Sequence, residues 1–321
     1  MVIKTIVMFA LLIVPICLVI INVVQSWPLL FAMYIIVGVG MAGIGMGVMH
    51  DAIHGSYSRN KILNKVVGWS LNLIGANDDV WRMQHNVLHH TYTNVKDGDD
   101  DINPPSFLRF SPHAPRQPIH RYQHWYTWLF YGLSTLSWVT TKDFIRLNKY
   151  RNLGLVKSPA TYRRYLIKMI LWKIVYFGYI LALPMIFSSF SVGMILLAFV
   201  VMHFVTGISM SVVFQTAHVM PDTEFHEADS NGTLAHERFV HQMATTCNFA
   251  PKSTILTWFI GGLNFQVEHH LFPNICHVHY RKLSPIVQRT AQEYGIPYLY
   301  KKTFAEAIVD HYRMLRTLGR S

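Results

Sequence analysis

Three histidines fall within six positions in the stretch HNVLHH, which contains His85, His89 and His90. The neutral imidazole ring is a good ligand for iron, copper, zinc and nickel. Residues four apart share one face of an α-helix, so His85 and His89 can point at one ion, with His90 beside them. His50 and His54, in HDAIH, repeat the spacing of four. The repeated pattern indicates a metal site.

Three further histidines extend the pattern: His218 in QTAH, and His269 and His270 in QVEHH. The eight residues form four clusters beside apolar stretches, so they could meet at one depth. Zinc needs only three or four ligands, whereas eight nitrogens suffice for two ions. A redox-active pair could activate O₂, which chemistry at an apolar C–H bond requires. One such histidine alone is more often a hydrogen-bonded residue at a helix end, but four clusters favour a metal centre.

The remaining histidines lack this pattern, and we do not expect them to bind metal. His203 lies inside an apolar segment, where packing or a hydrogen bond is its expected role. The others are His113, His120, His124, His226, His236, His241, His277, His279 and His311.

Acidic residues lie next to the histidine clusters. The run KDGDDD, at 96–101, directly follows HNVLHH. It could be a solvated loop, or its carboxylates could accept hydrogen bonds from the ligand rings and orient them. Asp51 and Glu268 are direct neighbours of cluster histidines and could have the same orienting role.

The composition is that of a membrane protein. Of the 321 residues, 51% are hydrophobic and only 14% are charged, against about 25% charged in a typical soluble domain. The net charge of +11 combined with long apolar runs predicts a positively charged cytoplasmic face and argues against a nucleic-acid-binding protein. There are three cysteines and no C-x-x-C pair, so neither a disulfide framework nor a thiolate metal site is expected.

Four apolar stretches are long enough to cross the bilayer as helices. They lie at about 5–24, 28–49, 165–187 and 192–214, and short connections join them into two hairpins. Glycines at the end of the second span favour close helix packing. The lysines of the third span, Lys168 and Lys173, could reach toward the membrane surface.

The polar segments 50–164 and 215–321 contain all the acidic residues and most of the basic ones. Because Lys- and Arg-rich segments stay in the cytoplasm, we place both segments, both termini and the metal site there. The stretches 66–76, 120–139 and 253–265 suit helices at the membrane surface. We therefore predict one domain over 1–321: an all-α membrane protein in which four transmembrane helices carry a cytoplasmic helical cap with the metal site.

The motifs H-x-x-x-H, H-x-x-x-H-H and Q-x-x-H-H occur in this order, with a hairpin between, and resemble those of the membrane fatty acid desaturases over about residues 45–290. The third motif begins with Gln266 in place of a histidine, and in this respect it resembles the third motif of the front-end acyl desaturases. Those enzymes place a double bond between an existing one and the carboxyl end. The resemblance implies O₂-dependent, delta-6-like or delta-5-like desaturation of a long-chain acyl-CoA, such as linoleoyl-CoA, or of a phospholipid acyl chain.

The resemblance also implies a set of site residues. Gln266 would be an iron ligand or a supporting residue, and Gln215 and Asp51 would be supporting residues near the cofactor. The ligands of the two iron ions would be His50, His54, His85, His89, His90, His218, His269 and His270.

Two further features concern partners. Many front-end desaturases carry a fused heme domain with the motif His-Pro-Gly-Gly, which this sequence lacks. We therefore expect a separate electron donor, either a ferredoxin or a free cytochrome. A basic patch either attracts lipid headgroups or cradles the phosphates of an acyl-CoA or phospholipid. It consists of Arg146, Lys149, Arg151, Arg163 and Arg164.

Other functions remain open. A di-iron hydroxylase of lipids, alkanes or carotenoids would also carry histidine motifs, and product analysis would distinguish it. A divalent-metal transporter would place its ligands in the middle of its spans, unlike these clusters. A zinc protease is disfavoured because HDAIH lacks the glutamate of H-E-x-x-H.

Overall fold

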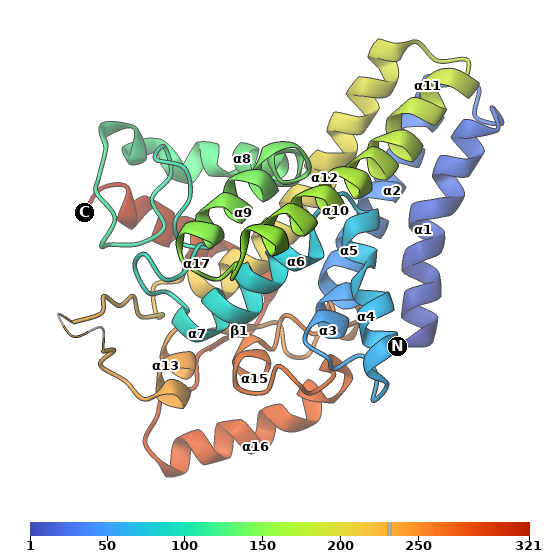
Figure 1. The fold of residues 1–321 in the computed structure, drawn as a ribbon. Coiled ribbons are helices and arrows are strands. Elements are labelled where there is room, and N and C mark those ends of the chain that lie inside the picture. The colour runs from blue at the N-terminus through green and yellow to red at the C-terminus, as the bar shows by residue number, and fades with distance from the viewer. Residues whose placement is uncertain (230, 232) are drawn as a thin grey trace. The chain divides into compact units, whose positions relative to one another are not determined.

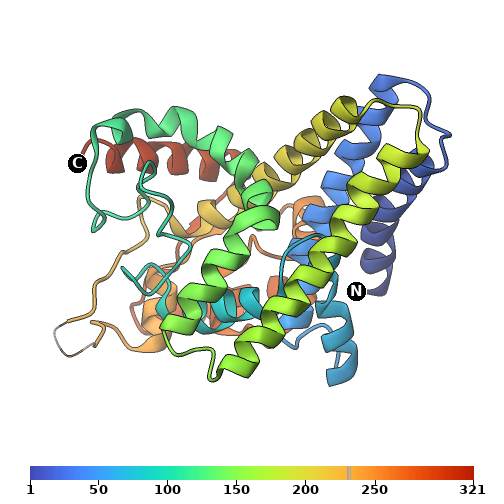
Figure 2. The same ribbon diagram turned by 45° about the horizontal axis from the view of Figure 1, so that its top comes forward.

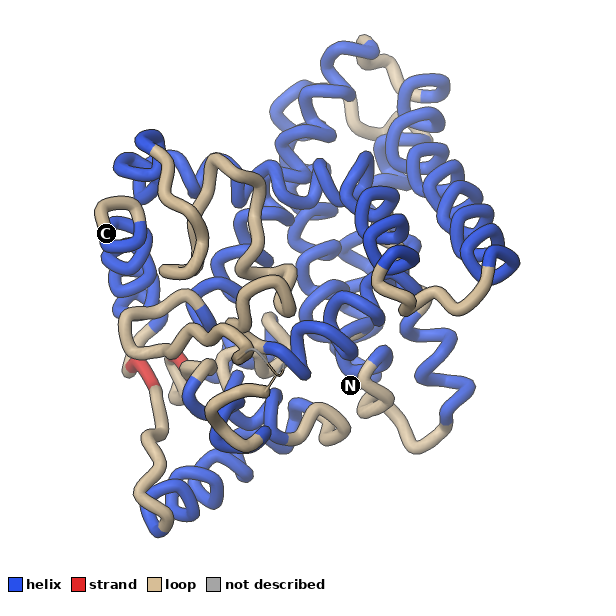
Figure 3. Tube along the Cα trace, turned by 60° about the vertical axis from the view of Figure 1, so that its left-hand side comes forward, coloured by secondary structure: helices blue, strands red, loops and turns tan. Residues whose placement is uncertain are grey.

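The computed structural model describes residues 1–229, 231 and 233–321. Helix dominates, and the strands within this part of the chain are β1 (Asn248–Phe249) and β2 (Tyr300–Lys301), a short parallel pair (Figure 3). Two compact units are formed. The first comprises Met1–Met83 and Phe130–Ser211, and the second comprises Gln84–Leu129 and Val212–Ser321. The expectation of a single domain stays a prediction.

Among the residues that the structure describes, four helices are long and apolar enough to span a membrane, which agrees with the predicted number of spans. They are α1 (Val2–Ile20), α2 with α3 (Trp27–Gly47 and Met49–Ile53), α10 with η4 and α11 (Pro159–Phe177, Gly178–Ala182 and Leu183–Phe187), and α12 (Val192–His218). The first helix ends four residues earlier than predicted, because Asn22 takes a left-handed φ of 57° and turns the chain. The fourth continues to His218, which the sequence placed beyond it.

The first two spans pack closely in the first unit, as the glycines of the second span predict. A side chain at Gly40 would place its Cβ 2.8 Å from the backbone nitrogen of Leu12. Helices α1 and α2 therefore run side by side at a distance that only glycine permits here (Figure 1). At the far end of the unit, the backbone N–H of Ser189 donates to the Asn22 side chain at 3.0 Å and ties the two hairpin tips together (Figure 2).

The lysines of the third span are paired with acidic residues, a feature that the sequence did not indicate, and their reach toward the membrane surface stays a prediction. Lys173 is buried and donates to Asp143 at 3.0 Å and to the carbonyls of Gly75 and Val139 at 3.1 and 2.8 Å. Lys168 contacts two carboxylates, those of Asp78 at 2.6 Å and Asp79 at 2.8 Å. A buried ammonium without such partners would be strongly destabilising, and the sequence does not show which acids approach it.

His203 confirms its predicted role as a packed, hydrogen-bonded residue. Its Nδ1 lies 3.1 Å from the Thr135 hydroxyl, which itself donates to the His203 carbonyl. Nδ1 therefore carries the proton, and Nε2 accepts from the Tyr176 hydroxyl at 2.7 Å. This completed network satisfies a polar ring inside a membrane-spanning helix.

Shorter helices complete the first unit. They are α4 (Lys61–Gly68), α5 (Ser70–Leu73), α6 (Asp78–Arg82), η3 (Trp138–Lys142) and α9 (Asp143–Asn152). The predicted surface helix at 66–76 is thus divided between α4 and α5, with Trp69 between them. Helix α8 (Gln123–Ser137) confirms the helix expected at 120–139.

The second unit is built from short helices joined by long loops. They are η1 (Met83–His89), α7 (His90–Tyr92), η2 (Pro118–Tyr122), α13 (Arg238–Ala244), α14 (Thr254–Phe259), α15 (Gln266–Leu271), η5 (His277–His279), α16 (Tyr280–Glu293) and α17 (Phe304–Leu318). Of the predicted helix 253–265 only α14 is helical, because Gly261 and Gly262 turn the chain with φ of 67° and 71°. Helix α15 packs against α13 and α16 (Figure 1).

Candidate metal centre

The second histidine motif is wound more widely than an α-helix. Residues Met83–His89 form η1, a π-helix in which hydrogen bonds run from i to i+5. In an α-helix the side chain of His90 would point about 140° away from that of His85. In the wider π-helix, residue i+5 lies about one turn after residue i, so the two side chains share a face. The Nε2 atoms of His85 and His90 accordingly lie 3.3 Å apart, while His89 stacks on His85 at 5.2 Å.

Six predicted ligands of the second unit come together in what we call the histidine cluster: His85, His89, His90, His218, His269 and His270. All six are buried. Two triads are close enough to share an ion each, and both include His270. One consists of His89, His218 and His270, and the other of His90, His269 and His270, with ligand atoms within 4.8 Å of one another.

The geometry fits metal binding. The Nε2 atoms of His89 and His218 are buried and have no hydrogen-bond partner among the described residues, although their rings lie only 4.8 Å apart. Such orphaned polar atoms destabilise a structure unless something fills the space between them. Two ligands bound at about 2.1 Å to one ion lie about 3.0–3.4 Å apart, which matches the separation of His85 Nε2 and His90 Nε2.

Asp99 fixes the orientation of His89. The Nδ1 of His89 lies 3.0 and 3.1 Å from the two carboxylate oxygens of Asp99, which is fully buried. Burial disfavours the charged ring, but the Asp99 carboxylate outweighs it and raises the pKa of His89 to about 9. The Nδ1–H group donates to Asp99, and a metal ion would bind at Nε2 by displacing the second proton that the raised pKa keeps there. Of the two roles left open for the KDGDDD run, the orienting role therefore holds for Asp99.

The turn that carries Asp99 depends on two residues that tolerate left-handed backbone. Asn94 has a φ of 56° and Asp97 a φ of 62°. Asn and Asp adopt this conformation more readily than other side-chain-bearing residues. The folded-back turn allows Asp99 to accept hydrogen bonds from the backbone N–H groups of Asn94 and Asp101 at 3.0 and 2.9 Å. These two bonds hold the carboxylate against His89.

The rings of His218 and His270 are oriented in the same way. The Nδ1 of His218 donates to the carbonyl of Thr245 at 3.2 Å. The Nδ1 of His270 donates to the Gln242 side-chain oxygen at 2.7 Å, because the Gln242 amide nitrogen is turned toward the carbonyl of His90. Both acceptors belong to α13 and its C-terminal end, a segment for which the sequence offered no signal.

Glu268 is held by a tyrosine and an asparagine of the second unit. Its carboxylate accepts from the Tyr298 hydroxyl at 2.6 Å and from the Asn248 amide at 2.8 Å. Asn248 also accepts from the backbone of Val267 at 2.9 Å. Glu268 therefore anchors α15, which carries His269 and His270, and a role in orienting either ring stays a prediction.

The two glutamines named from the sequence are both close to histidine-cluster segments. Gln266 begins α15, is 1% exposed, and its amide nitrogen has no hydrogen-bond partner among the described residues. Gln215 donates to the carbonyl of Asp101 at 3.2 Å, which joins the end of α12 to the acidic run. A role for either residue at a metal stays a prediction.

The first histidine motif lies in the first unit. The rings of His50 and His54 are 4.8 Å apart, and Trp81 packs against both, at 5.7 and 6.3 Å. The carboxylate of Asp51 lies 4.0 Å from the Nδ1 of His50, at the limit of an ion pair. The α-helical spacing of four therefore brings the two rings together as predicted.

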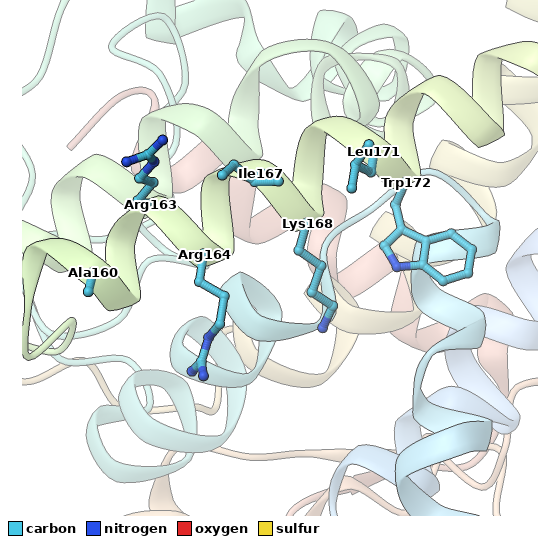
Figure 4. Close-up of a pocket in the computed structure, with 7 residues that line it drawn as sticks. All are labelled: Ala160, Arg163, Arg164, Ile167, Lys168, Leu171 and Trp172. Atoms are coloured by element: carbon cyan, nitrogen blue, oxygen red, sulfur yellow. The ribbon is translucent and has the colours of Figure 1, made fainter.

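A groove of about 520 Å³ lies along α10 in the first unit (Figure 4). Ala160, Arg164, Lys168 and Trp172 form one row of side chains four residues apart, and Arg163, Ile167 and Leu171 form the other. Lys168 is paired with acids, as described above, and the two arginines add further positive charge, with Arg164 over the ring of Tyr165 at 5.4 Å. Of the predicted basic patch, Arg163 and Arg164 line this groove, whereas Arg151 lies over the ring of Tyr162.

Comparison with known proteins identifies the family. A model of the family described as fatty acid desaturase matches residues 25–302. The chain belongs to the fatty acid desaturase family. This desaturase is similar to the sn-1 linoleoyl-lipid 6-desaturases of Synechocystis sp., 36% identical over 89% of this chain and 79% of the relative, and of Arthrospira platensis, 34% identical over 89% and 77%. It is also 36% identical to the acyl-lipid (8-3)-desaturase of Physcomitrium patens, over 91% of this chain and 60% of that protein.

These comparisons confirm the family and the enzyme class predicted from the sequence. The protein is a membrane-bound oxidoreductase of lipid metabolism, and its relatives carry the names expected of front-end acyl desaturases. Within the desaturase, the histidine clusters are groups that could bind metal.

Proposed function

We propose that the protein is an O₂-dependent front-end desaturase whose histidines hold two iron ions. The observation that carries this proposal is the meeting of three remote segments in the histidine cluster, where the Nε2 atoms of His89 and His218 are buried and lack a hydrogen-bond partner in the described part of the chain. Iron suits an imidazole set, and the two overlapping triads suit two neighbouring ions. From the sequence pattern alone, we propose His50 and His54 as further ligands.

When bound, a redox-active iron pair supplies the activation of O₂ that C–H chemistry requires. The protein's own residues hold the ligands in place. The Nδ1–H groups of His89, His218 and His270 donate hydrogen bonds and so direct the Nε2 atoms of these rings toward a metal. The acceptors are Asp99, the carbonyl of Thr245 and Gln242, respectively. Overall, two adjacent methylene groups lose one hydrogen each, and O₂ takes up these hydrogens together with two electrons and two protons to give two waters.

The substrate class follows from the relatives. Relatives named as linoleoyl-lipid 6-desaturases support an acyl chain on a membrane lipid as the substrate, with delta-6-like positioning of the new double bond. The four apolar helices would give the enzyme direct access to such lipids. An acyl-CoA thioester remains the second carrier to test.

We further propose that both termini and the histidine cluster face the cytoplasm, because the segments outside the four spans carry most of the Lys and Arg residues. The two electrons would come from a separate donor, a ferredoxin or a free cytochrome. The positive charge of the chain, +11 in total, would attract an acidic donor of this kind.

Expression in a host that lacks polyunsaturated lipids tests the proposal. Supplied with linoleate, cells should accumulate a triene with its new double bond on the carboxyl side, seen by gas chromatography with mass spectrometry. His89→Ala and His218→Ala should abolish the product and lower the iron content of the purified protein. His279→Ala is the matched control, because His279 is an exposed histidine outside the cluster.

The products also distinguish the alternatives. A hydroxylated acyl chain in place of the alkene would overturn desaturation while leaving the iron site intact. Full iron content and activity in both His89→Ala and His218→Ala would overturn the proposed ligand set.

A further inference from the structure

A second group of potential metal ligands lies in the second unit, in a segment that the histidine motifs do not include. Glu224, His226, His236 and His241 form this group, which we call the lateral cluster. The Glu224 carboxylate oxygen Oε2 lies 3.2 Å from His226 Nε2 and 3.1 Å from His236 Nε2. The ring of His226 is 5.3 Å from that of His236 and 5.0 Å from that of His241.

The two histidines near Glu224 differ, because His236 Nε2 is hydrogen-bonded to the carboxylate at 3.1 Å whereas His226 Nε2 is not. Although His226 Nε2 lies 3.2 Å from the carboxylate, it has no hydrogen-bond partner among the described residues, so the N–H direction misses the oxygen. Ligands of one ion behave in this way, because their lone pairs converge on a third point and not on each other. The separation of 3.2 Å between His226 Nε2 and the Glu224 oxygen, which no hydrogen bond explains, matches the separation of about 3.0–3.4 Å between ligands bound at about 2.1 Å.

His241 adds a buried ring nitrogen that could bind a metal, next to His226. Its Nε2 lies 2.9 Å from the carbonyl of Thr93, so Nε2 carries the proton and Nδ1 keeps its lone pair. The residue is 1% exposed, and Nδ1 has no hydrogen-bond partner within the described chain. A buried acceptor nitrogen next to the His226 ring is stabilised by a cation and is costly without one.

The chemistry of the set points to a particular class of cation. Three imidazoles and one carboxylate give four ligands, the number and type that Zn²⁺ takes in tetrahedral sites. Hard cations such as Ca²⁺ and Mg²⁺ prefer oxygen ligands and do not suit it. Because the side chains of His236 and Glu224 are 35% and 53% exposed, an ion can enter from solvent.

We propose that the lateral cluster binds one divalent transition-metal ion, with Zn²⁺ as the best match, independently of the iron centre. His226, His236 and His241 lack the spacing from which the sequence predicted ligands, since the site needs the chain to fold back from Glu224 to α13. The site goes beyond the proposed desaturation and would be structural.

The position of this site gives it a defined effect. The backbone of His226 pairs with the turn that orients His89: its N–H donates to Asn94 at 3.0 Å, and its carbonyl accepts from Lys96 at 2.9 Å. His241 bonds the carbonyl of Thr93 and is followed directly by Gln242, the partner of His270. An ion in the lateral cluster would therefore brace two supports of the histidine cluster.

Calorimetric titration of the purified, iron-loaded enzyme with Zn²⁺ tests the proposal. One Zn²⁺ per chain should bind without release of iron, measured in the same samples by mass spectrometry of the metals. The double variant Glu224→Gln/His236→Ala should bind Zn²⁺ at least tenfold more weakly and keep its iron. The matched control His113→Ala/Glu227→Gln removes a neighbouring pair, 3.4 Å apart, and should bind as the wild type does.

Three results would overturn the proposal: no Zn²⁺ bound by the wild type, Zn²⁺ that enters only as iron leaves, or equal affinity in the double variant. Hydrogen exchange tests the bracing effect. Zn²⁺ should slow exchange at the amides of Lys96 and His226 in the wild type only. Unchanged exchange on Zn²⁺ binding would exclude a brace. Because none of these readouts requires turnover, failure of the desaturation proposal would be recognised separately.

Discussion

Asp99→Asn is a sharp test of how the histidine cluster is oriented. The substitution preserves shape but replaces one carboxylate oxygen with an amide group that donates. Both oxygens of Asp99 are already acceptors: Oδ2 accepts from His89 and Asn94, and Oδ1 accepts from His89 and Asp101. Whichever way the new amide turns, its NH₂ group faces a backbone N–H.

The expected effect can be estimated from this geometry. One buried backbone N–H loses its acceptor, which costs about 1–3 kcal/mol. The His89 ring also loses its anionic partner, and such losses weaken metal binding about 10- to 100-fold, or about 1.4–2.8 kcal/mol. We expect iron content at limiting Fe²⁺, and with it desaturation, to fall by one to two orders of magnitude.

The assay combines metal analysis of the purified protein with chromatography of fatty acid methyl esters from the same cells. Asp97→Asn is the control, because Asp97 is exposed, lies in the same turn and has the left-handed φ of 62° that Asn accepts. It should keep its iron and its activity. Wild-type iron affinity and turnover in Asp99→Asn would show that the carboxylate does not orient His89.

Three further predictions follow from other parts of the molecule. Gly40→Leu should destabilise the first hairpin and lower the melting temperature in detergent, because the added side chain meets helix backbone at 2.8 Å. Burial lowers the pKa of His311 to about 4, against about 6.5 in the unfolded chain. Below about pH 6.5 the unfolded chain therefore binds a proton at His311 that the folded chain does not bind. The free energy of unfolding should fall by up to about 3 kcal/mol from pH 7 to pH 4. Thermal melts should show this fall in the wild type and a smaller one in His311→Gln. Arg163→Gln/Arg164→Gln should reduce the anionic phospholipid retained on purification, measured by native mass spectrometry.

Each of these predictions has a control. Gly193→Ala adds a side chain where no atom lies within 4 Å, and should leave the melting temperature unchanged. An equal acid sensitivity of His311→Gln and the wild type would contradict the assignment of the proton to this ring. Lys149→Gln/Arg151→Gln removes the same amount of charge from α9 and should retain the anionic phospholipid. If this variant and Arg163→Gln/Arg164→Gln lose equal amounts of phospholipid, the net charge of the protein and not the α10 groove attracts the lipid.

The four membrane spans could be predicted because hydropathy is a property of each segment alone. The residues at which the spans begin and end were harder to predict. Nothing in the stretch after residue 214 breaks the helix, so α12 runs on to His218, whereas α1 stops early at the Asn22 turn. The pairing of Lys173 with Asp143 joins residues thirty positions apart and leaves no local trace in the sequence.

The gathering of the histidines could be predicted from their spacing, but the groups that orient their rings could not. The acidic run after the second motif fitted two roles equally well, and the choice depends on the left-handed residues Asn94 and Asp97, which bend Asp99 back onto His89. Gln242 and Thr245 lie about 150 residues beyond that motif. Only the packing of α13 against α15 brings them to the rings of His270 and His218.

The widened winding of η1 has a consequence for protein engineering. Three ring nitrogens can gather from one short stretch only because the backbone carries a surplus residue there, so that His90 faces back toward His85. A designer who copies the letters H-x-x-x-H-H onto a straight α-helical scaffold would obtain two converging rings and a third aimed elsewhere. A design that is to gather all three rings must therefore include the π-helical segment Met83–His89 and the contacts that stabilise it against an ordinary α-helix.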